Sequence, residues 1–321
     1  MKKKDTNAKE EKIKIKKRKD KKSSTVEVKV IDAFKFDVDN LTQSRKTETK
    51  LFAFQLENIG INNPIVIVNN ENDASKIKSK IGTCEYQFRK GVGYVGEVFR
   101  LVYCGAEQRK NEKDETYTVY KFCGFKKDNR KLVPSTSKTL ELNYDELKYI
   151  YPLVLAKDLK NKFEWSKNYI IFPYEEGKRQ PVDEETLKKE APNLYKYLLS
   201  KRDDIERQSS YNRRIQRTNE FYGLIRVGMY TYGDYFVAIR DNTKIVANVV
   251  KKIKTDWGIE KIPIFDGHVS YVKAKCEKEA KFIARIINSK DVRFVLSNLY
   301  DVRSIGSRLP IKIPKYTGCD E

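Results

Sequence analysis

Residues 25–72 carry a pattern of apolar and polar positions that is typical of strands. Residues 25–31 (TVEVKVI) alternate with period two, and short apolar runs follow at 51–56 and 64–68. This alternation places successive side chains on opposite faces of a strand, and the Asn- and Gly-containing stretch between the later runs is typical of turns. The pattern predicts a small β-rich unit over residues 25–80, with a break at 69–73.

Further apolar runs predict a larger domain over residues 81–321. Residues 97–103 and 116–122 are expected to form paired strands around a polar loop at 107–115, and residues 235–240 alternate as another strand.

In two later regions the apolar residues recur at helical spacing. Residues 181–208 predict helix, with Asp183 as its cap, acidic residues in the first turn and a restart at Pro192. Residues 276–288 and 291–299 each carry an apolar stripe at helical spacing. The expected fold class is therefore α+β: a β-rich N-terminal unit, followed by a mixed strand and helix domain with C-terminal helices.

Residues 1–24 differ from everything that follows. They hold 11 Lys and 1 Arg against 2 Asp and 2 Glu, with almost no apolar side chains. Such a segment cannot bury a core, so we predict a disordered basic tail that attracts phosphate without sequence preference. A tail that only improves solubility is the alternative.

The charge of the whole chain points to a polyanionic partner. Lys and Arg number 66 against 45 Asp and Glu, a net charge of +21 over 321 residues. Nucleic acid is the first expectation and an anionic membrane surface the second. Heat-adapted proteins also carry many charges, but that trend raises both signs together and does not give this excess.

The cysteines and the hydropathy of the chain bear on its cellular compartment and on the kinds of site it can hold. The five cysteines are far apart with no CxxC pair, which argues against a zinc site, and an odd count without a signal peptide favours a reducing cytoplasm. No run approaches the roughly 20 apolar residues that a membrane-spanning helix needs.

Residues 221–240 stand out as a candidate recognition segment. Residues 226–233 interleave tyrosine, arginine and glycine, and residues 235–240 read as a strand. Tyrosine can stack or hydrogen-bond, arginine can grip phosphate or guanine, and glycine permits close approach of the backbone. A hydrophobic hairpin with tyrosines in its core is the alternative.

A glycine-rich stretch at 88–96 (FRKGVGYVG) matches the spacing of the dinucleotide-binding fingerprint. That fingerprint requires a following helix, whose N-terminus holds the pyrophosphate, whereas a β-branched and aromatic run follows here. We therefore expect a glycine turn that places Arg89 and Lys90 against a phosphate backbone.

The sequence assigns no catalytic residue and no metal site. A histidine-dependent site would have to use His268, the single histidine, which we expect to be a satisfied loop residue or one that faces DNA. The acids at 183–185 with Lys188 loosely fit a metal-nuclease pattern but lie at a helix start, where acids are expected. Residues 62–65 (NNPI) lack the second proline and the aromatic of a base-holding methyltransferase loop.

The order of several segments resembles the C-terminal target-recognition region of N6-adenine DNA methyltransferases of restriction–modification systems, in particular fused type II enzymes. The stretches that carry the likeness are 88–96 with Phe99, YIIFPY at 169–174, PNLYKYLL at 192–199 with Arg207, 222–241, and ARIINS at 284–289 followed by RSIGSRLPIKIP at 303–314. The likeness covers roughly residues 84–316, and the last pair is its most specific part.

The resemblance implies a domain, residues 81–321, that reads a short DNA sequence and presents its adenine to a methyltransferase. Because the catalytic domain is missing, we expect a separate specificity subunit, with residues 25–80 as a docking unit. The expected partners are double-stranded DNA and a catalytic methyltransferase or endonuclease subunit, in the cytoplasm and without a membrane. No cofactor is expected in this chain, since S-adenosylmethionine and Mg²⁺ would belong to the partner.

Under this hypothesis, some side chains read base edges and others contact the DNA backbone. The candidates for reading base edges are Arg226, Tyr230, Tyr232, Arg240 and Asn242. The candidates for contacting the DNA backbone are Arg89, Lys90, Arg213, Arg214, Arg217, Arg303 and Arg308. Two other functions stay open: the broken-off half of an active adenine methyltransferase or endonuclease, and a basic RNA-binding protein.

Overall fold

The computed structural model describes residues 25–31, 48–55, 65–68, 71–93, 98–128, 131–207, 218–240, 245–297 and 309–319. Backbone contacts divide the chain into two compact units. The first comprises residues 1–79 with 298–301, and the second comprises residues 80–297 with 302–321. The predicted basic tail at 1–24 lies outside the described residues.

The first unit contains a three-stranded antiparallel sheet in the order β1-β2-β3. Its strands are β1 (Thr25–Ile31), β2 (Glu48–Gln55) and β3 (Ile65–Val68), so the strands expected from alternation are present. The break expected at 69–73 is where helix α1 (Glu71–Lys80) begins. The docking role of this unit stays a prediction.

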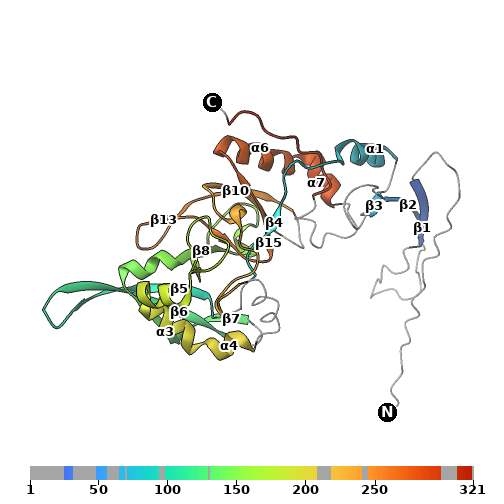
Figure 1. Ribbon diagram of the computed structural model, residues 1–321. Helices are drawn as coiled ribbons and strands as arrows, with labels where there is room; N and C mark the ends of the chain where they lie inside the picture. The colour runs from blue at the N-terminus through green and yellow to red at the C-terminus, as the bar shows by residue number, and fades with distance from the viewer. Residues whose placement is uncertain are drawn as a thin grey trace, which may run out of the picture. The chain divides into compact units, whose positions relative to one another are not determined.

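The second unit is built on a six-stranded sheet in the order β14-β8-β9-β5-β6-β7. Only β14 and β8 pair in parallel; the other neighbours are antiparallel. Its strands are β5 (Arg100–Lys110), β6 (Thr116–Asp128), β7 (Lys131–Leu142), β8 (Ile150–Val154), β9 (Asn168–Ile171) and β14 (Ile264–Phe265). Strands β5 and β6 form a long hairpin that extends from this unit (Figure 1).

Strand β7 was not anticipated from the sequence. It contains Pro134 and a run of serine and threonine, which break the apolar alternation that marks a strand. The strand order explains why this is tolerated, since β7 is the last strand of its sheet and has only β6 as a partner. Proline lacks the N–H that a central strand must donate and is therefore confined to such edges.

A second sheet in this unit has the order β11-β10-β15-β4. Its strands are β4 (Arg89–Lys90), β10 (Tyr235–Arg240), β11 (Ala247–Lys251) and β15 (Val269–Ala274), and a separate two-stranded sheet pairs β12 (Ile253–Lys254) with β13 (Glu260–Lys261). Helix α6 (Glu277–Ile287) packs against β10, β11 and β15 and is followed by α7 (Lys290–Ser297). Both expected C-terminal helices are confirmed.

The expected helical region at 181–208 is divided into three short helices. These are α2 (Glu184–Glu190), α3 (Pro192–Ser200) and α4 (Arg202–Glu206), with Pro192 in the first turn of α3. Three short 3₁₀ helices complete the unit: η1 (Tyr144–Tyr149), η2 (Ala156–Asp158) and η3 (Met229–Thr231).

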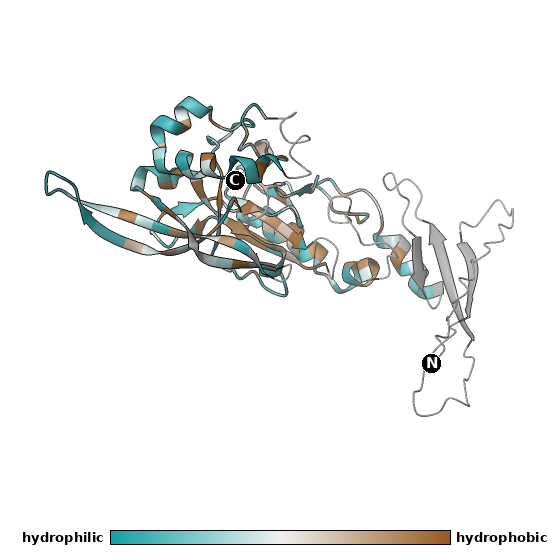
Figure 2. Cartoon of the chain, turned by 90° about the horizontal axis from the view of Figure 1, so that it is seen from below, coloured by the Kyte–Doolittle hydropathy of each residue, from teal (hydrophilic) through white to brown (hydrophobic). Residues whose placement is uncertain are grey.

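The core of the second unit is rich in tyrosine whose hydroxyls find backbone acceptors. Tyr174 donates to the carbonyl of Leu224 at 3.2 Å, and Tyr222 donates to the carbonyl of Val182 at 2.8 Å. Buried hydroxyls need such partners, because an unsatisfied one costs free energy on folding. These bonds fix the start of the candidate recognition segment onto the core. Figure 2 shows apolar residues in the central strands and hydrophilic residues at the distal end of the β5–β6 hairpin.

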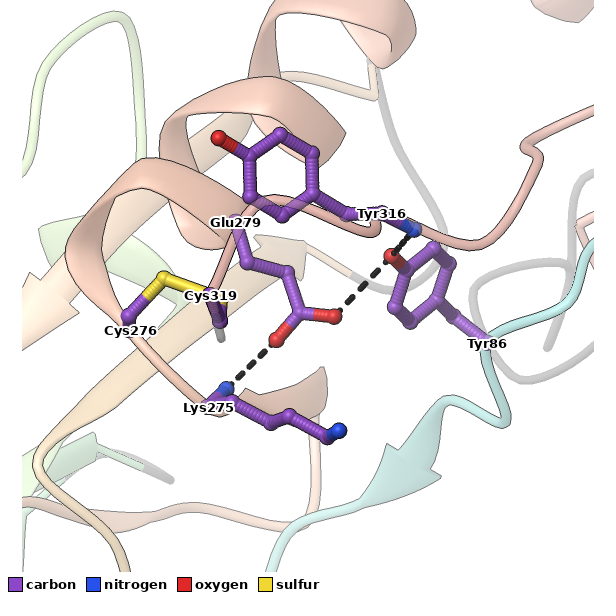
Figure 3. The surroundings of a disulfide bond; sticks show 6 residues. All are labelled: Tyr86, Lys275, Cys276, Glu279, Tyr316 and Cys319. Atoms are coloured by element: carbon purple, nitrogen blue, oxygen red, sulfur yellow. Dashed lines mark hydrogen bonds between the residues drawn. A yellow bond between two sulfur atoms is a disulfide. The ribbon is translucent and has the colours of Figure 1, made fainter. Parts of the chain in front are cut away.

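Four of the five cysteines are joined as disulfides, Cys104 to Cys123 and Cys276 to Cys319, and Cys84 is free. This pairing differs from the reduced thiols that a reducing compartment implies, and the cytoplasmic location stays a prediction. Figure 3 shows the second disulfide beside the buried Glu279 carboxylate, which accepts from the Tyr86 hydroxyl and the Lys275 backbone. The C-terminal segment is thereby fixed to the start of α6.

The fold is α+β, with antiparallel and mixed sheets and helices outside them. Among the described residues, no helix combines the length and apolar character that crossing a bilayer requires.

Candidate nucleic-acid interface

The glycine-rich stretch joins two distant segments of the second unit. The backbone N–H of Val92 donates to the carbonyl of Phe265 at 2.8 Å, and Gly93 and Ile225 exchange hydrogen bonds of 3.0 and 3.2 Å. A Cβ on Gly91 would lie 2.2 Å from the carbonyl oxygens of Phe265 and Asp266. Glycine is therefore required at position 91 for close packing of backbone against backbone. This packing explains one of the glycines that match the dinucleotide-binding fingerprint, and it needs no bound nucleotide.

Arg226 is held in the loop that precedes η3. Its φ of 65° lies in the left-handed region, which a side chain other than glycine adopts at a cost. Its Nη1 donates to the carbonyl of Gly91 at 3.5 Å, and a Cβ on Gly267 would lie 3.4 Å from the same nitrogen. The side chain is nevertheless exposed, so the guanidinium lies at the surface where the three segments meet.

Tyr230 is the centre of this surface. The guanidinium carbon of Arg89 lies 5.5 Å from the centroid of the Tyr230 ring, within the range of a cation–π contact. The ring is half-buried and lies 6.2 Å from that of Tyr271. Burial raises the pKa of the Tyr230 hydroxyl, and the positive charges of Arg89, Arg226 and Arg179 oppose that rise.

We name Arg89, Arg179, Arg226 and Tyr230 the arginine–tyrosine cluster. The three arginines are exposed and act electrostatically on one tyrosine, although they come from β4, from the turn after β9 and from the loop before η3. Two of them were expected to contact DNA, in different roles. Arg179 was missed, since the local sequence EEGKRQ at 175–180 carries charges of both signs and marks only a turn.

The remaining described candidates differ in accessibility. Tyr232 is only 4% exposed, and its hydroxyl donates to the carbonyl of Lys178 at 2.5 Å, so this tyrosine packs in the core. Arg240 ends β10 and is half-buried, and its Nε is buried without a hydrogen-bond partner among the described residues. Lys90 is half-buried on β4, opposite Ser270.

The other six candidate residues lie outside the described part of the chain, and their roles stay predictions. They are Asn242, Arg213, Arg214, Arg217, Arg303 and Arg308.

His268 lies in the loop that Arg226 approaches through Gly267. The Nδ1 of His268 is 2.8 Å from Oδ1 of Asp266, and the same oxygen accepts the His268 backbone N–H at 2.9 Å. The histidine side chain is 77% exposed and the aspartate side chain 6%. The carboxylate therefore holds an exposed ring beside the arginine–tyrosine cluster, as expected for a satisfied loop histidine or one that faces a ligand.

The acids at the start of α2 cap the helix. Asp183 accepts the Thr186 backbone N–H at 2.8 Å and the Thr186 hydroxyl at 2.7 Å, and these bonds lower the pKa of the Asp183 carboxyl. This is the helix-start role that the sequence favoured over a nuclease site. Within the part of the chain that the structure describes, no group of three or more His, Cys, Asp or Glu side chains is arranged to hold a metal ion.

The arrangement can bind a flat, negatively charged partner. Arginine forks match phosphate oxygens and base edges, and a half-buried tyrosine offers a stacking surface between them. No protein-family model and no curated protein matches this chain.

Proposed function

We propose that this protein is a sequence-specific DNA-binding subunit of a restriction–modification or adenine-methylation system, which presents duplex DNA to a separate catalytic chain. The observation that carries the proposal is the arginine–tyrosine cluster, in which Arg89 lies 5.5 Å from the centroid of the Tyr230 ring and Arg226 donates to the carbonyl of Gly91, two positions after Arg89. The net charge of +21 supports a polyanionic partner. The restriction–modification setting rests on the resemblance in segment order alone.

The division of labour in the proposal follows from exposure. Arg89, Arg179 and Arg226 are exposed and supply charge, while Tyr230 is half-buried and positioned by its neighbours. Charge contacts to phosphate give salt-dependent affinity, whereas base contacts give preference for a sequence. S-adenosylmethionine and Mg²⁺ would be bound by the catalytic partner.

The test is a binding titration on duplex DNA over a range of salt concentrations. The preferred site is found first, by selecting bound duplexes from a pool of random sequences. Arg89→Ala and Arg179→Ala should weaken binding on all sequences and reduce the salt slope by about 1 each. Arg226→Ala should cost about 1–3 kcal/mol and relax the preference at one position.

Arg207→Ala is the matched control, since Arg207 is an exposed arginine that caps the C-terminus of α4, pairs with Asp203 and does not belong to the arginine–tyrosine cluster. If Arg207→Ala weakens binding as much as the cluster variants do, the affinity reflects net charge, and the cluster is not the binding surface.

Deleting residues 1–24 should weaken binding by a similar factor on every sequence, because a lysine tail contacts phosphate only. A changed site preference after this deletion would contradict that role.

Two further assays separate the alternatives. Incubation of the purified chain with DNA, Mg²⁺ and S-adenosylmethionine should give neither strand cuts nor methyl transfer, and either product would instead support the enzyme-fragment hypothesis. Competition among duplex DNA, RNA and anionic vesicles should favour duplex DNA. Preference for RNA would support the basic RNA-binding alternative.

A further inference from the structure

A second surface of the same unit carries an independent feature. A pocket of about 690 Å³ lies between the β5–β6 hairpin, the end of β7, η1 and the start of α3. Its lining includes Arg109, Tyr117, Tyr120, Tyr144, Asp145 and Asn193. None of them belongs to the arginine–tyrosine cluster.

The pocket collects exposed aromatic rings. Four large hydrophobic side chains are exposed among the described residues, and two of them, Tyr117 at 41% and Tyr144 at 54%, line this one pocket. The rings of Tyr120 and Tyr144 lie 6.2 Å apart with their planes inclined by 48°, so they stand at an angle and do not stack. Exposed aromatic rings that lie together in one depression are typical of binding surfaces.

The positive charge at the pocket wall is already neutralised. Arg109 donates to both oxygens of Glu141, at 2.8 and 3.0 Å, and also pairs with Glu107, which binds Lys121. The bond from Arg109 lowers the pKa of Glu141. Asp145 is exposed and forms no ion pair within the described residues, so it gives the pocket an unbalanced negative charge.

Asp145 and Asn193 supply hydrogen-bond acceptors to the pocket. Asn193 donates from its backbone and from Nδ2 to the buried carboxylate of Glu146, at 2.7 and 2.9 Å. One Nδ2 hydrogen is thereby used toward the protein, and Oδ1 is an acceptor that Asn193 can offer to a ligand. Together, Asp145, Asn193 and the tyrosine rings provide acceptors and π faces, which suit a cation.

We propose that this pocket binds an arginine side chain of a partner polypeptide. A planar guanidinium can lie against tyrosine rings while its N–H groups reach Asp145 and Asn193, which a compact ammonium does less well. The carboxylate disfavours phosphate, so a nucleic-acid strand is not the expected occupant. The net charge of +21 repels a basic partner from the chain as a whole, whereas the carboxylate of Asp145 attracts it at this pocket. The charge complementarity is therefore local.

The test uses N-acetyl-arginine methylamide as the probe on the full chain, followed through the NMR signals of the tyrosine rings. A saturable shift is expected, and the neutral citrulline analogue should bind roughly fivefold more weakly because it lacks the charge. Equal binding of the citrulline analogue, tighter binding of adenosine monophosphate, or no saturable shift up to the solubility limit of the probe would each overturn the proposal.

Two variants locate the site. Tyr144→Ala and Asp145→Asn should each weaken binding of the probe roughly threefold or more. Asp204→Asn, which removes an exposed carboxylate on α4, is the matched control and should leave it unchanged. Tyr144, Asp145 and Asp204 are all exposed, so the three variants should fold. An effect of Asp204→Asn equal to that of Asp145→Asn would show a non-specific charge effect and overturn the assignment. The DNA-binding titration of the proposed function does not depend on this pocket, so the two proposals can fail separately.

Discussion

The Nη1 of Arg226 donates to the carbonyl of Gly91 at 3.5 Å, across 135 positions of sequence. Arg226 adopts a φ of 65° to make this contact, a conformation that costs an arginine roughly 1 kcal/mol or more. The loop before η3 and the glycine-rich stretch are thereby joined into one surface.

Gly91→Ala should destabilise the second unit. The new Cβ would meet the backbone oxygens of Phe265 and Asp266 at 2.2 Å, and backbone cannot move aside as a flexible side chain can. We expect a loss of about 2–3 kcal/mol in the free energy of unfolding, measured by urea titration. Gly177→Ala is the control, because it meets nothing within 4 Å but has a φ of 79°. Gly91 is not among the glycines of positive φ, so strain of that kind does not act there, and a loss below about 1 kcal/mol in Gly91→Ala would contradict the collision.

Glu146→Gln should also be destabilising. Glu146 is 2% exposed, and its carboxylate accepts N–H bonds from Asn143, Leu194 and, twice, Asn193. An amide has one acceptor oxygen and would place its own N–H₂ against these donors. The expected cost is about 2–3 kcal/mol by thermal or chemical unfolding.

Glu185→Gln, at an exposed position of α2, should change stability by less than about 0.5 kcal/mol. If the two variants behaved alike, the buried hydrogen bonds of Glu146 would be unimportant for folding.

Lys261 should make stability depend on pH. Burial lowers the pKa of Lys261 from 10.5 to about 7. Between these values the unfolded chain binds more protons than the folded chain, so the free energy of unfolding rises with pH. The carbonyls of Leu147 and Lys148, and the Tyr151 ring at 4.4 Å, stabilise the ammonium and reduce the size of the effect.

The measurement compares wild type with Lys261→Met at pH 7 and pH 9. The stability of the wild type relative to the variant should increase by at most about 1 kcal/mol per pH unit. Lys148→Met, which removes an exposed lysine, should give a difference that stays flat. A wild-type advantage that shrinks as pH rises would contradict the sign.

The disulfide pairing predicts the number of reactive thiols. Alkylation of the denatured, unreduced chain should label one cysteine, Cys84, and labelling after reduction should reach all five, as counted by mass spectrometry. Cys319→Ser opens the bridge to Cys276, which closes a 43-residue separation, and should cost about 2–4 kcal/mol. Five labels without reductant would show that the chain folds with free thiols.

Much of the secondary structure could be predicted because it rests on local patterns. Period-two alternation located β1 and β10, and apolar stripes located α6 and α7. Strand β7 escaped because its proline and hydroxyl residues are compatible with an edge strand only when the sheet order is known. The candidate site was predicted in part, since Arg89, Arg226 and Tyr230 come together, whereas Arg179 carried no local signal.

The sequence by itself determined the α+β class, the positive excess and the segments rich in arginine, tyrosine and glycine. The tertiary structure decided which of these side chains share a surface. Tyr230 and Tyr232 are two positions apart in one motif, yet one is half-exposed among arginines and the other is buried against the Lys178 carbonyl. The reason is physical: periodicity reports how a segment faces its own neighbours, and accessibility depends on segments more than a hundred positions away.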